Sequence, residues 1–257
     1  MRENRLKQRL RDGETQIGTW VHTLAMPPLA QVLATAGFDF VYIDMEHSAF
    51  SLQTVTDFCR SGLDIGLPVL VRPAGHVGHL ISRPVENGAF GVLMPHVDTA
   101  ADARLAVEAV KFPPLGKRGS QPPNVHTAYA RVNTADYMAA SNEQTMIMVQ
   151  IESPQALANL DEILDTEGVD GAVVGRGDLS AELGVPGQRD HPDVLAAVDT
   201  LIAACRKRQK FPGLLVQDTT EAREWVSRGI QVVAYASEVM MLRDAGAAAL
   251  AAIRADQ

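Results

Sequence analysis

The sequence has only two cysteines, which rules out a disulfide framework as the basis of the fold. Cys59 and Cys205 lie far apart, and both fall in stretches with a helical pattern. Neither has a second cysteine at the short spacing typical of metal and redox motifs. We expect two reduced thiols in a cytoplasmic protein, with a single long-range disulfide as the alternative.

Positive charge is also scarce. The chain has 23 Lys and Arg against 31 Asp and Glu, a net charge of -8, with no basic cluster to neutralise phosphates. No apolar run approaches the roughly 18 residues of a membrane span. The mixed charges of residues 1–11 exclude a secretory signal. These absences predict a cytoplasmic location without nucleic-acid or membrane partners.

Lysine is rare, and its positions disfavour one class of catalyst. The five lysines fall on predicted helices, on loops or at the far end of a predicted strand: Lys7, Lys111, Lys117, Lys207 and Lys210. An enzyme that forms a Schiff base needs a lysine inside its active site. Segments 217–220 and 236–238 also lack a glycine-rich phosphate-binding loop, so we do not expect a phosphorylated substrate.

What the sequence does contain is a regular alternation of strand-like and helix-like segments. Strand candidates are 17–21, 38–44, 68–72, 91–95, 145–151, 171–175, 212–217 and 231–236. Helical patterns lie near 27–36, 51–63, 77–87, 101–110, 154–165, 191–208, 219–228 and 238–253. The strands are continuously apolar, as in strands covered on both faces.

Eight such pairs predict an α/β fold, a (β/α)8 TIM barrel, formed as one domain over residues 1–257. A doubly wound sheet is the alternative, but its glycine-rich fingerprint is missing after 17–21. The long connection 112–142 is interpreted as a lid or interface element at the strand-end face, or as a plain surface excursion. The segment 245–253 is apolar nearly all round, so we expect that helix to be buried, and another subunit is a candidate cover.

Acidic residues stand at the ends of two predicted strands. Glu152 follows 145–151, and Asp178 follows 171–175. Strand ends that face the same way converge on one site, where two carboxylates can hold Mg²⁺ or Mn²⁺. The sequence therefore predicts a metal site, and the alternative for Asp178 is to cap the following helix.

Other polar residues stand at the ends of the second and third strands or just after them. Arg72 offers a planar donor fork to a carboxylate or an enolate oxygen, or else makes a structural ion pair. His47 can move a proton near neutral pH. Asp44 is expected to orient its loop or His47, and Glu46 is expected to face solvent. This set indicates enolate chemistry on a 2-oxo acid.

The remaining histidines give weaker signals. His96 is interpreted either as a site residue or as a packed loop histidine. His76 and His79 lie at a helix entry, and two histidines without further ligands are poor support for zinc.

Six segments spread over nearly the whole chain form a recognisable set: QIGTW at 16–20, AGFDFVYIDMEH at 36–47, VRP at 71–73, FPPLGKRG at 112–119, VQIE at 149–152 and GDLS at 177–180. Together they resemble the HpcH/HpaI family of metal-dependent (class II) pyruvate aldolases, of the 4-hydroxy-2-oxoheptanedioate and 2-dehydro-3-deoxyglucarate aldolase type.

The resemblance implies a barrel whose last helix packs on a neighbouring subunit, in a trimer-based hexamer with sites near the interfaces. It also implies a ligand set. Glu152 and Asp178 would bind Mg²⁺, Mn²⁺ or Co²⁺. Gln150 and the backbone at Gly177 and Asp178 would hold pyruvate, with Trp20 in the substrate pocket.

The resemblance further assigns catalytic roles. Arg72 would stabilise the enolate, and His47 would transfer the proton, with Asp44 beside them. A carboxylate that increases the basicity of the histidine aligns with Glu86, where relatives often carry aspartate. Relatives also often read Gly-Pro-Ala-Asp where this chain reads Gly175–Asp178 with Arg176 inside, and Arg176 either recognises a second acidic group or points to solvent.

The expected reaction is the reversible cleavage of a 4-hydroxy-2-oxo acid into pyruvate and an aldehyde through a metal-stabilised pyruvate enolate. Oxaloacetate decarboxylation and cleavage of a malyl-type thioester use the same enolate and remain alternatives. Two remote alternatives are a non-catalytic binding protein with an Arg176-Gly177-Asp178 adhesion motif and a barrel that has lost catalysis. The residues select neither the aldehyde nor the metal.

Overall fold

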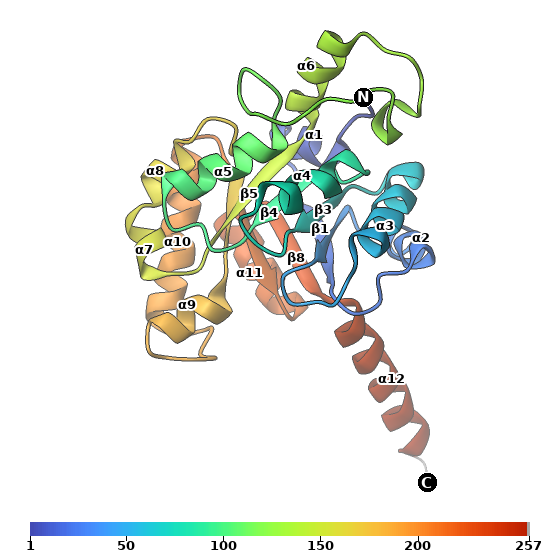
Figure 1. The fold of residues 1–257 in the computed structure, drawn as a ribbon. Coiled ribbons are helices and arrows are strands. Elements are labelled where there is room, and N and C mark those ends of the chain that lie inside the picture. Colours follow the sequence, from blue (N-terminus) through green and yellow to red (C-terminus); the bar gives the residue numbers. More distant parts are fainter. Residues whose placement is uncertain (256–257) are drawn as a thin grey trace.

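The computed structural model describes residues 1–255 and contains a closed barrel of eight strands (Figure 1). Each strand pairs in parallel with the next, and the last pairs with the first. The strands are β1 (Gln16–Val21), β2 (Phe40–Asp44), β3 (Val69–Arg72), β4 (Gly91–Met94), β5 (Met146–Ile151), β6 (Gly171–Val174), β7 (Phe211–Val216) and β8 (Val232–Ser237). The predicted (β/α)8 barrel is confirmed, and the doubly wound alternative is wrong.

Helices surround the barrel and connect its strands. They are α1 (Arg5–Arg11), α2 (Pro27–Thr35), α3 (Leu52–Ile65), α4 (Gly78–Glu86), α5 (Ala100–Val110), α6 (Thr134–Gln144), α7 (Pro154–Ala158), α8 (Leu160–Leu164), α9 (Arg176–Glu182), α10 (Pro192–Lys207), α11 (Thr219–Arg228) and α12 (Glu238–Arg254), with a 3₁₀ turn η1 (Val125–Thr127). The sequence did not predict α1 or α6. Among the described helices, none is both long and apolar enough to cross a membrane.

Helix α1 closes the amino-terminal end of the barrel. Its Leu6 and Leu10 are almost fully buried and join the cluster of side chains inside the barrel. Burying each leucine contributes about 2 kcal/mol. Lys7 Nζ lies 2.9 Å from Asp170 Oδ1 and donates to the carbonyl of Thr145 at 3.0 Å. Because this end is blocked, a substrate must enter where the strands finish.

The long connection between α5 and β5 lies at the blocked end of the barrel, beside the chain's amino terminus in Figure 1. Lys111 Nζ donates to the carbonyls of Asn142 and Thr145, both at 2.7 Å, and so caps the end of α6. The expectation of a lid at the strand-end face is wrong for this chain. The reason is chain order, because α5 returns the backbone to the end at which β5 begins.

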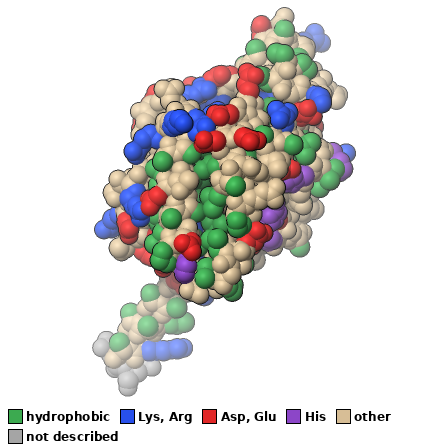
Figure 2. Space-filling model, turned by 90° about the vertical axis from the view of Figure 1, so that its left-hand side faces the viewer, with side chains coloured by type: hydrophobic (Ala, Val, Ile, Leu, Met, Phe, Trp, Pro, Cys, Tyr) green, Lys and Arg blue, Asp and Glu red, His purple; other side chains and the backbone are tan. Residues whose placement is uncertain are grey.

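Helix α12 projects from the barrel (Figures 1 and 2). Leu242 and Ile253 are each 66% exposed, and Leu250 is 50% exposed. This chain does not itself bury the helix, since Glu238 at its start is the buried residue among those described, and cover by another subunit stays a prediction.

An apolar groove of about 580 Å³ remains open on the outer side of β1 and β8. Its lining comprises Thr15, Ile17, Thr219, Ala222, Arg223, Val226, Ser227, Val233 and Tyr235. In a barrel of this kind a helix usually covers each pair of strands, so the groove marks a place that this chain leaves uncovered.

Buried His126 predicts a pH-dependent stability. Its Nε2 lies 2.8 Å from the carbonyl of Val85, and burial lowers its pKa to about 4. The unfolded chain takes up this proton near pH 6.5. The stabilisation is therefore complete above that pH and is lost as the pH falls toward 4. Between pH 7.5 and pH 5, we expect the free energy of unfolding of the wild type to fall by about 2 kcal/mol more than that of His126→Gln, measured by urea unfolding at pH 7.5, 6 and 5. The exposed His79→Gln serves as control, and equal slopes for wild type and His126→Gln would contradict the assignment.

Candidate active site

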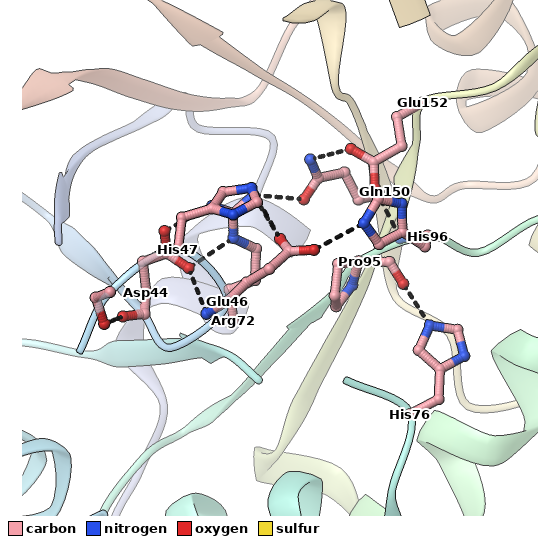
Figure 3. Close-up of polar contacts among 10 residues, drawn as sticks. Asp44, Glu46, His47, Arg72, His76, Pro95, His96, Gln150 and Glu152 are labelled. Atoms are coloured by element: carbon pink, nitrogen blue, oxygen red, sulfur yellow. Dashed lines mark hydrogen bonds and ion pairs between the residues drawn. The ribbon is translucent and has the colours of Figure 1, made fainter. Parts of the chain in front are cut away.

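The predicted site residues meet in a cavity of about 360 Å³ at the carboxyl ends of the strands. Those that line it are Trp20, Asp44, His47, Arg72, Gln150, Gly177 and Asp178. Glu152 lies beside them, with its Oε2 2.5 Å from Gln150 Nε2 (Figure 3). Residues from separate strands thus form one polar group, as the strand-end argument predicted.

Arg72 and Asp44 form a buried, two-pronged ion pair. Arg72 Nε donates to Asp44 Oδ1 at 2.8 Å, and Nη2 donates to Oδ2 at 2.6 Å. Burial alone would raise the pKa of Asp44, but hydrogen bonding and charge from Arg72 outweigh it and lower that pKa. The ring of Trp20 stacks 4.6 Å from the guanidinium carbon. Asp44 therefore orients Arg72, and also its own loop, since it accepts the Glu46 N–H at 2.9 Å.

Glu46 points into the site, contrary to the expectation that it faces solvent. Its side chain is 11% exposed. Oε2 lies 3.0 Å from Arg72 Nη1 and 3.7 Å from His47 Nε2, and Oε1 lies 2.8 Å from His96 Nε2. The reason is the turn after β2, in which Asp44 holds the backbone of Glu46 and directs its side chain to the neighbouring strand ends.

Glu152 is a buried carboxylate with few positive partners. Its Oε1 accepts the main-chain N–H of His96 at 2.7 Å. Burial raises its pKa, and the charges of Asp178 and Glu46 add to the rise, whereas the hydrogen bond and charge of His96 oppose it. A carboxylate in this environment gains from a cation placed between it and Asp178.

Gly175 leaves the space that Glu152 occupies. A Cβ atom at this position would lie 2.4 Å from Glu152 Oε2 and 2.8 Å from Gln150 Nε2. No side chain fits at either distance without displacing these groups. The glycine at the end of β6 therefore allows the two site residues of β5 to lie against it.

Asp178 is not the cap of helix α9. Gly175 occupies the N-cap position, and Asp178 stands in the first turn and lines the cavity. The capping alternative is therefore not realised, and its role as a metal ligand stays a prediction.

The oxygen donors here fit a hard divalent cation. Among residues 1–255, no three His, Cys, Asp or Glu side chains are grouped as a site made of protein ligands alone. Mg²⁺ and related ions commonly use one or two carboxylates and leave the other positions to water and substrate. The buried Glu152 and the cavity-lining Asp178 match this pattern.

The structure does not bring Glu86 to His47. Glu86 ends helix α4, which runs away from the strand ends, and it lines a different cavity with Phe112 and Arg118. The carboxylate that contacts His47 is Glu46. The role expected of Glu86 stays a prediction that no contact among the described residues supports.

Arg176 does not point to solvent. It is 4% exposed, pairs with Glu221 and donates to the carbonyl of Leu215 at 2.8 Å. An adhesion motif must present its arginine to a partner, so the burial of this side chain removes the basis for that alternative.

The sequence alone did not identify two residues that shape the site, His96 and Glu238, or the contact made by His76. His96 was left undecided, and it touches both Glu46 and Glu152. Glu238 was not noticed, although it follows β8 and so carried the same strand-end signal as Glu152. Its Oε1 accepts the main-chain N–H groups of Thr23 and Leu24 at 2.6 and 2.9 Å, which fixes the loop after β1. His76 binds the carbonyl of Pro95 at 2.7 Å, a structural contact.

Comparison with known proteins identifies the family. Residues 16–245 match the sequence profile described as HpcH/HpaI aldolase/citrate lyase. The chain belongs to this family. The resemblance noted from the six segments is confirmed.

Relatives within the HpcH/HpaI family are similar over almost the whole chain. A hydroxypyruvate/pyruvate aldolase from Sagittula stellata is 36% identical over 246 residues, covering 96% of both chains. A 2-keto-3-deoxy-L-rhamnonate aldolase from Escherichia coli K12 is 37% identical over 243 residues, covering 94% of this chain and 90% of the relative. The crystal structure of an HpcH/HpaI aldolase from Desulfitobacterium hafniense DCB-2 has a TM-score of 0.92 at 30% identity, covering 97% of this chain and 96% of that one. The protein is an enzyme, a carbon–carbon lyase.

Gly175→Ala tests the close packing in the site. The added methyl group must displace Glu152 or Gln150, and misplacement of about 1 Å typically costs about 10²-fold in rate. We expect a loss of that order in the aldolase kcat, measured by coupled assay. Gly78→Ala is the control, because its Cβ would meet no described atom within 4 Å. Equal activity of the two variants would contradict the packing argument.

Proposed function

We propose that this enzyme catalyses the reversible cleavage of 4-hydroxy-2-oxo acids into pyruvate and an aldehyde, with Mg²⁺, Mn²⁺ or Co²⁺ as cofactor. The observation that carries the proposal is the meeting of the Arg72 guanidinium, the Gln150 amide and the carboxylate of Asp178 in one cavity, with Glu152 adjacent.

The residues at the ends of β5 and β6 would hold the ion and the 2-oxo acid. When bound, the divalent ion polarises the 2-oxo group and offsets negative charge that develops on it. Glu152 and Asp178 would hold the ion. Gln150 and the main-chain N–H groups of Gly177 and Asp178, which lie in the first turn of α9 and lack helical partners, would orient pyruvate.

Arg72 stabilises the enolate oxygen in this mechanism. Asp44 occupies its Nε and Nη2, so the remaining Nη1 faces Gln150 Oε1 at 3.5 Å and Glu46 Oε2 at 3.0 Å. Arg72 is 8% exposed, and its guanidinium is fixed by Asp44 before the substrate arrives. A charge held in this way favours the transition state without reorganisation during the reaction.

His47 accepts the proton of the 4-hydroxyl group in the cleavage direction. As that proton leaves, the C3–C4 bond breaks, the hydroxyl carbon becomes the aldehyde, and the electron pair enters the enolate, which is then protonated to pyruvate. The side chain of His47 is 62% exposed and lies at the rim of the cavity, beside Glu46. This position suits a base that acts between the buried pyruvate end and the entering or leaving aldehyde.

Other substrates use the same enolate and are ranked by assay. Reactions of oxaloacetate and of malyl-type thioesters would form the same enolate. One relative is named a hydroxypyruvate/pyruvate aldolase, so hydroxypyruvate is a further candidate substrate. Measuring pyruvate release from oxaloacetate, a malyl thioester and several 4-hydroxy-2-oxo acids separates these reactions.

We further propose that the enzyme is a homo-oligomer, a trimer-based hexamer, in which α12 of one copy packs on another. The exposure of Leu242, Leu250 and Ile253 supports this arrangement, because an apolar helix standing in water gains from any apolar cover. The groove beside β1 and β8 supplies an apolar surface of the right kind.

Arg72→Lys tests the role of the guanidinium. Lysine keeps a positive charge beside Asp44, so we expect the fold to survive. Its ammonium group lacks the planar fork with which the guanidinium binds Asp44 and presents a further nitrogen to the substrate at the same time. We expect kcat/KM for pyruvate release to fall about 10²- to 10³-fold. The exposed Arg104→Gln is the control. Activity equal to wild type would contradict the role of Arg72.

Chelation tests the metal requirement separately. We expect excess EDTA to abolish pyruvate release and added Mn²⁺ to restore it. Without the ion, the carboxylates of Glu152 and Asp178 would repel the negative charge that develops on the 2-oxo group. Full activity in excess EDTA would refute the metal mechanism.

The double variant Leu250→Glu/Ile253→Glu tests the packing of α12. Two charges on the proposed contact surface disfavour burial, so we expect a smaller assembly mass by light scattering, with unchanged helix content. The control is Leu105→Glu, which alters an exposed apolar residue on α5. An unchanged assembly mass in the double variant would overturn the proposed contact.

A further inference from the structure

His96, in the loop after β4, contacts two carboxylates of the site at once (Figure 3). Its Nδ1 lies 3.1 Å from Glu152 Oε1, and its Nε2 lies 2.8 Å from Glu46 Oε1. Its main-chain N–H also donates to Glu152 Oε1 at 2.7 Å. Glu152 is the predicted metal ligand, and Glu46 contacts Arg72.

The backbone at His96 is strained in a way that serves these contacts. Its φ of 49° lies in the left-handed region, which residues other than glycine adopt uncommonly, although histidine, asparagine and aspartate do so more often than the rest. Such strain persists where the surroundings fix the chain. Here the carbonyl of Pro95 is held by His76 at 2.7 Å, and the N–H of Val97 donates to the carbonyl of Gln150 at 3.3 Å. The strained turn aims the N–H of His96 at Glu152.

We propose that His96 is a positioning residue that fixes the metal ligand Glu152 and links it through Glu46 to Arg72. This inference rests on the proposed metal role of Glu152. All three contacts of His96 use Oε1 of Glu152 or Oε1 of Glu46. The second oxygen of each carboxylate therefore remains available to the site. Glu152 Oε2 accepts from Gln150 Nε2, and Glu46 Oε2 pairs with Arg72 Nη1.

The imidazole of His96 separates two carboxylates, Glu46 and Glu152, in a site that contains several acidic side chains. Glu46 and Asp178 both place negative charge near the buried carboxylate of Glu152. Without a group between Glu46 and Glu152, each carboxylate would turn toward solvent or toward Arg72. An outer group that orients a ligating carboxylate typically changes metal affinity 10- to 100-fold.

Mn²⁺ affinity measured by calorimetry without substrate tests the proposal. His96→Asn and His96→Gly both accept the left-handed backbone and keep the N–H contact, but neither side chain can span Glu46 and Glu152. We expect both variants to bind Mn²⁺ about 10- to 100-fold more weakly than wild type, with unchanged circular dichroism. The matched control is His79→Asn, an exposed histidine on α4, which should bind Mn²⁺ as wild type does.

A double-mutant cycle separates a link through Glu46 from general loosening of the loop. If His96 acts together with Glu46, combining His96→Asn with Glu46→Ala should weaken Mn²⁺ binding by clearly less than the product of the two single effects. Fully independent effects would overturn the link.

The remaining outcomes distinguish this inference from the proposed function. Wild-type affinity in both His96→Asn and His96→Gly would overturn the positioning role and leave the metal mechanism standing. Failure of the wild-type protein to bind Mn²⁺ would overturn the metal assignment itself, together with this inference.

Discussion

The two-pronged contact between Arg72 and Asp44 is the interaction on which the rest of the site depends. It joins the ends of β2 and β3 and fixes the plane of the guanidinium against Trp20. Removing one partner would leave a buried charge, which typically costs about 3–5 kcal/mol. With two nitrogens bound to Asp44, the third faces Gln150 and Glu46. The catalytic geometry is therefore set largely by a contact between two protein groups.

The barrel could be predicted because its signal is repeated along the chain. Continuous apolar runs such as 145–151 and 171–175 indicate strands that are covered on both faces. Their regular alternation with helices is compatible with only a few α/β topologies. The errors lie where this repetition stops. Helix α1 has a charged sequence with two leucines, Leu6 and Leu10. Their packing against the end of the barrel is a tertiary contact that the local sequence pattern does not indicate. Helix α12 looks like a buried helix, but an apolar pattern does not say which chain provides the cover.

The site was predictable to the extent that strand ends define it. Arg72, Gln150 and Asp178 all follow from their places at the end of a strand, and they line one cavity. Side-chain direction within loops was not predictable. Glu46 turns inward because of a hydrogen bond to Asp44, and His96 reaches two acids because of its positive φ. Alignment of Glu86 with a family carboxylate likewise did not reveal that α4 carries it to the other end of the barrel.

The plug formed by α1 also affects the order of events in a catalytic cycle. With one end of the barrel sealed by Leu6 and Leu10, arriving and departing molecules share a single mouth. In the proposed assignment the 2-oxo acid lies deep, against Gln150 and Arg72, while the aldehyde lies outside it, near His47. Of the two products of cleavage, the aldehyde must then depart first, and in the synthetic direction the 2-oxo acid must bind first. The kinetics would be sequential and ordered because the inner ligand cannot pass the outer one.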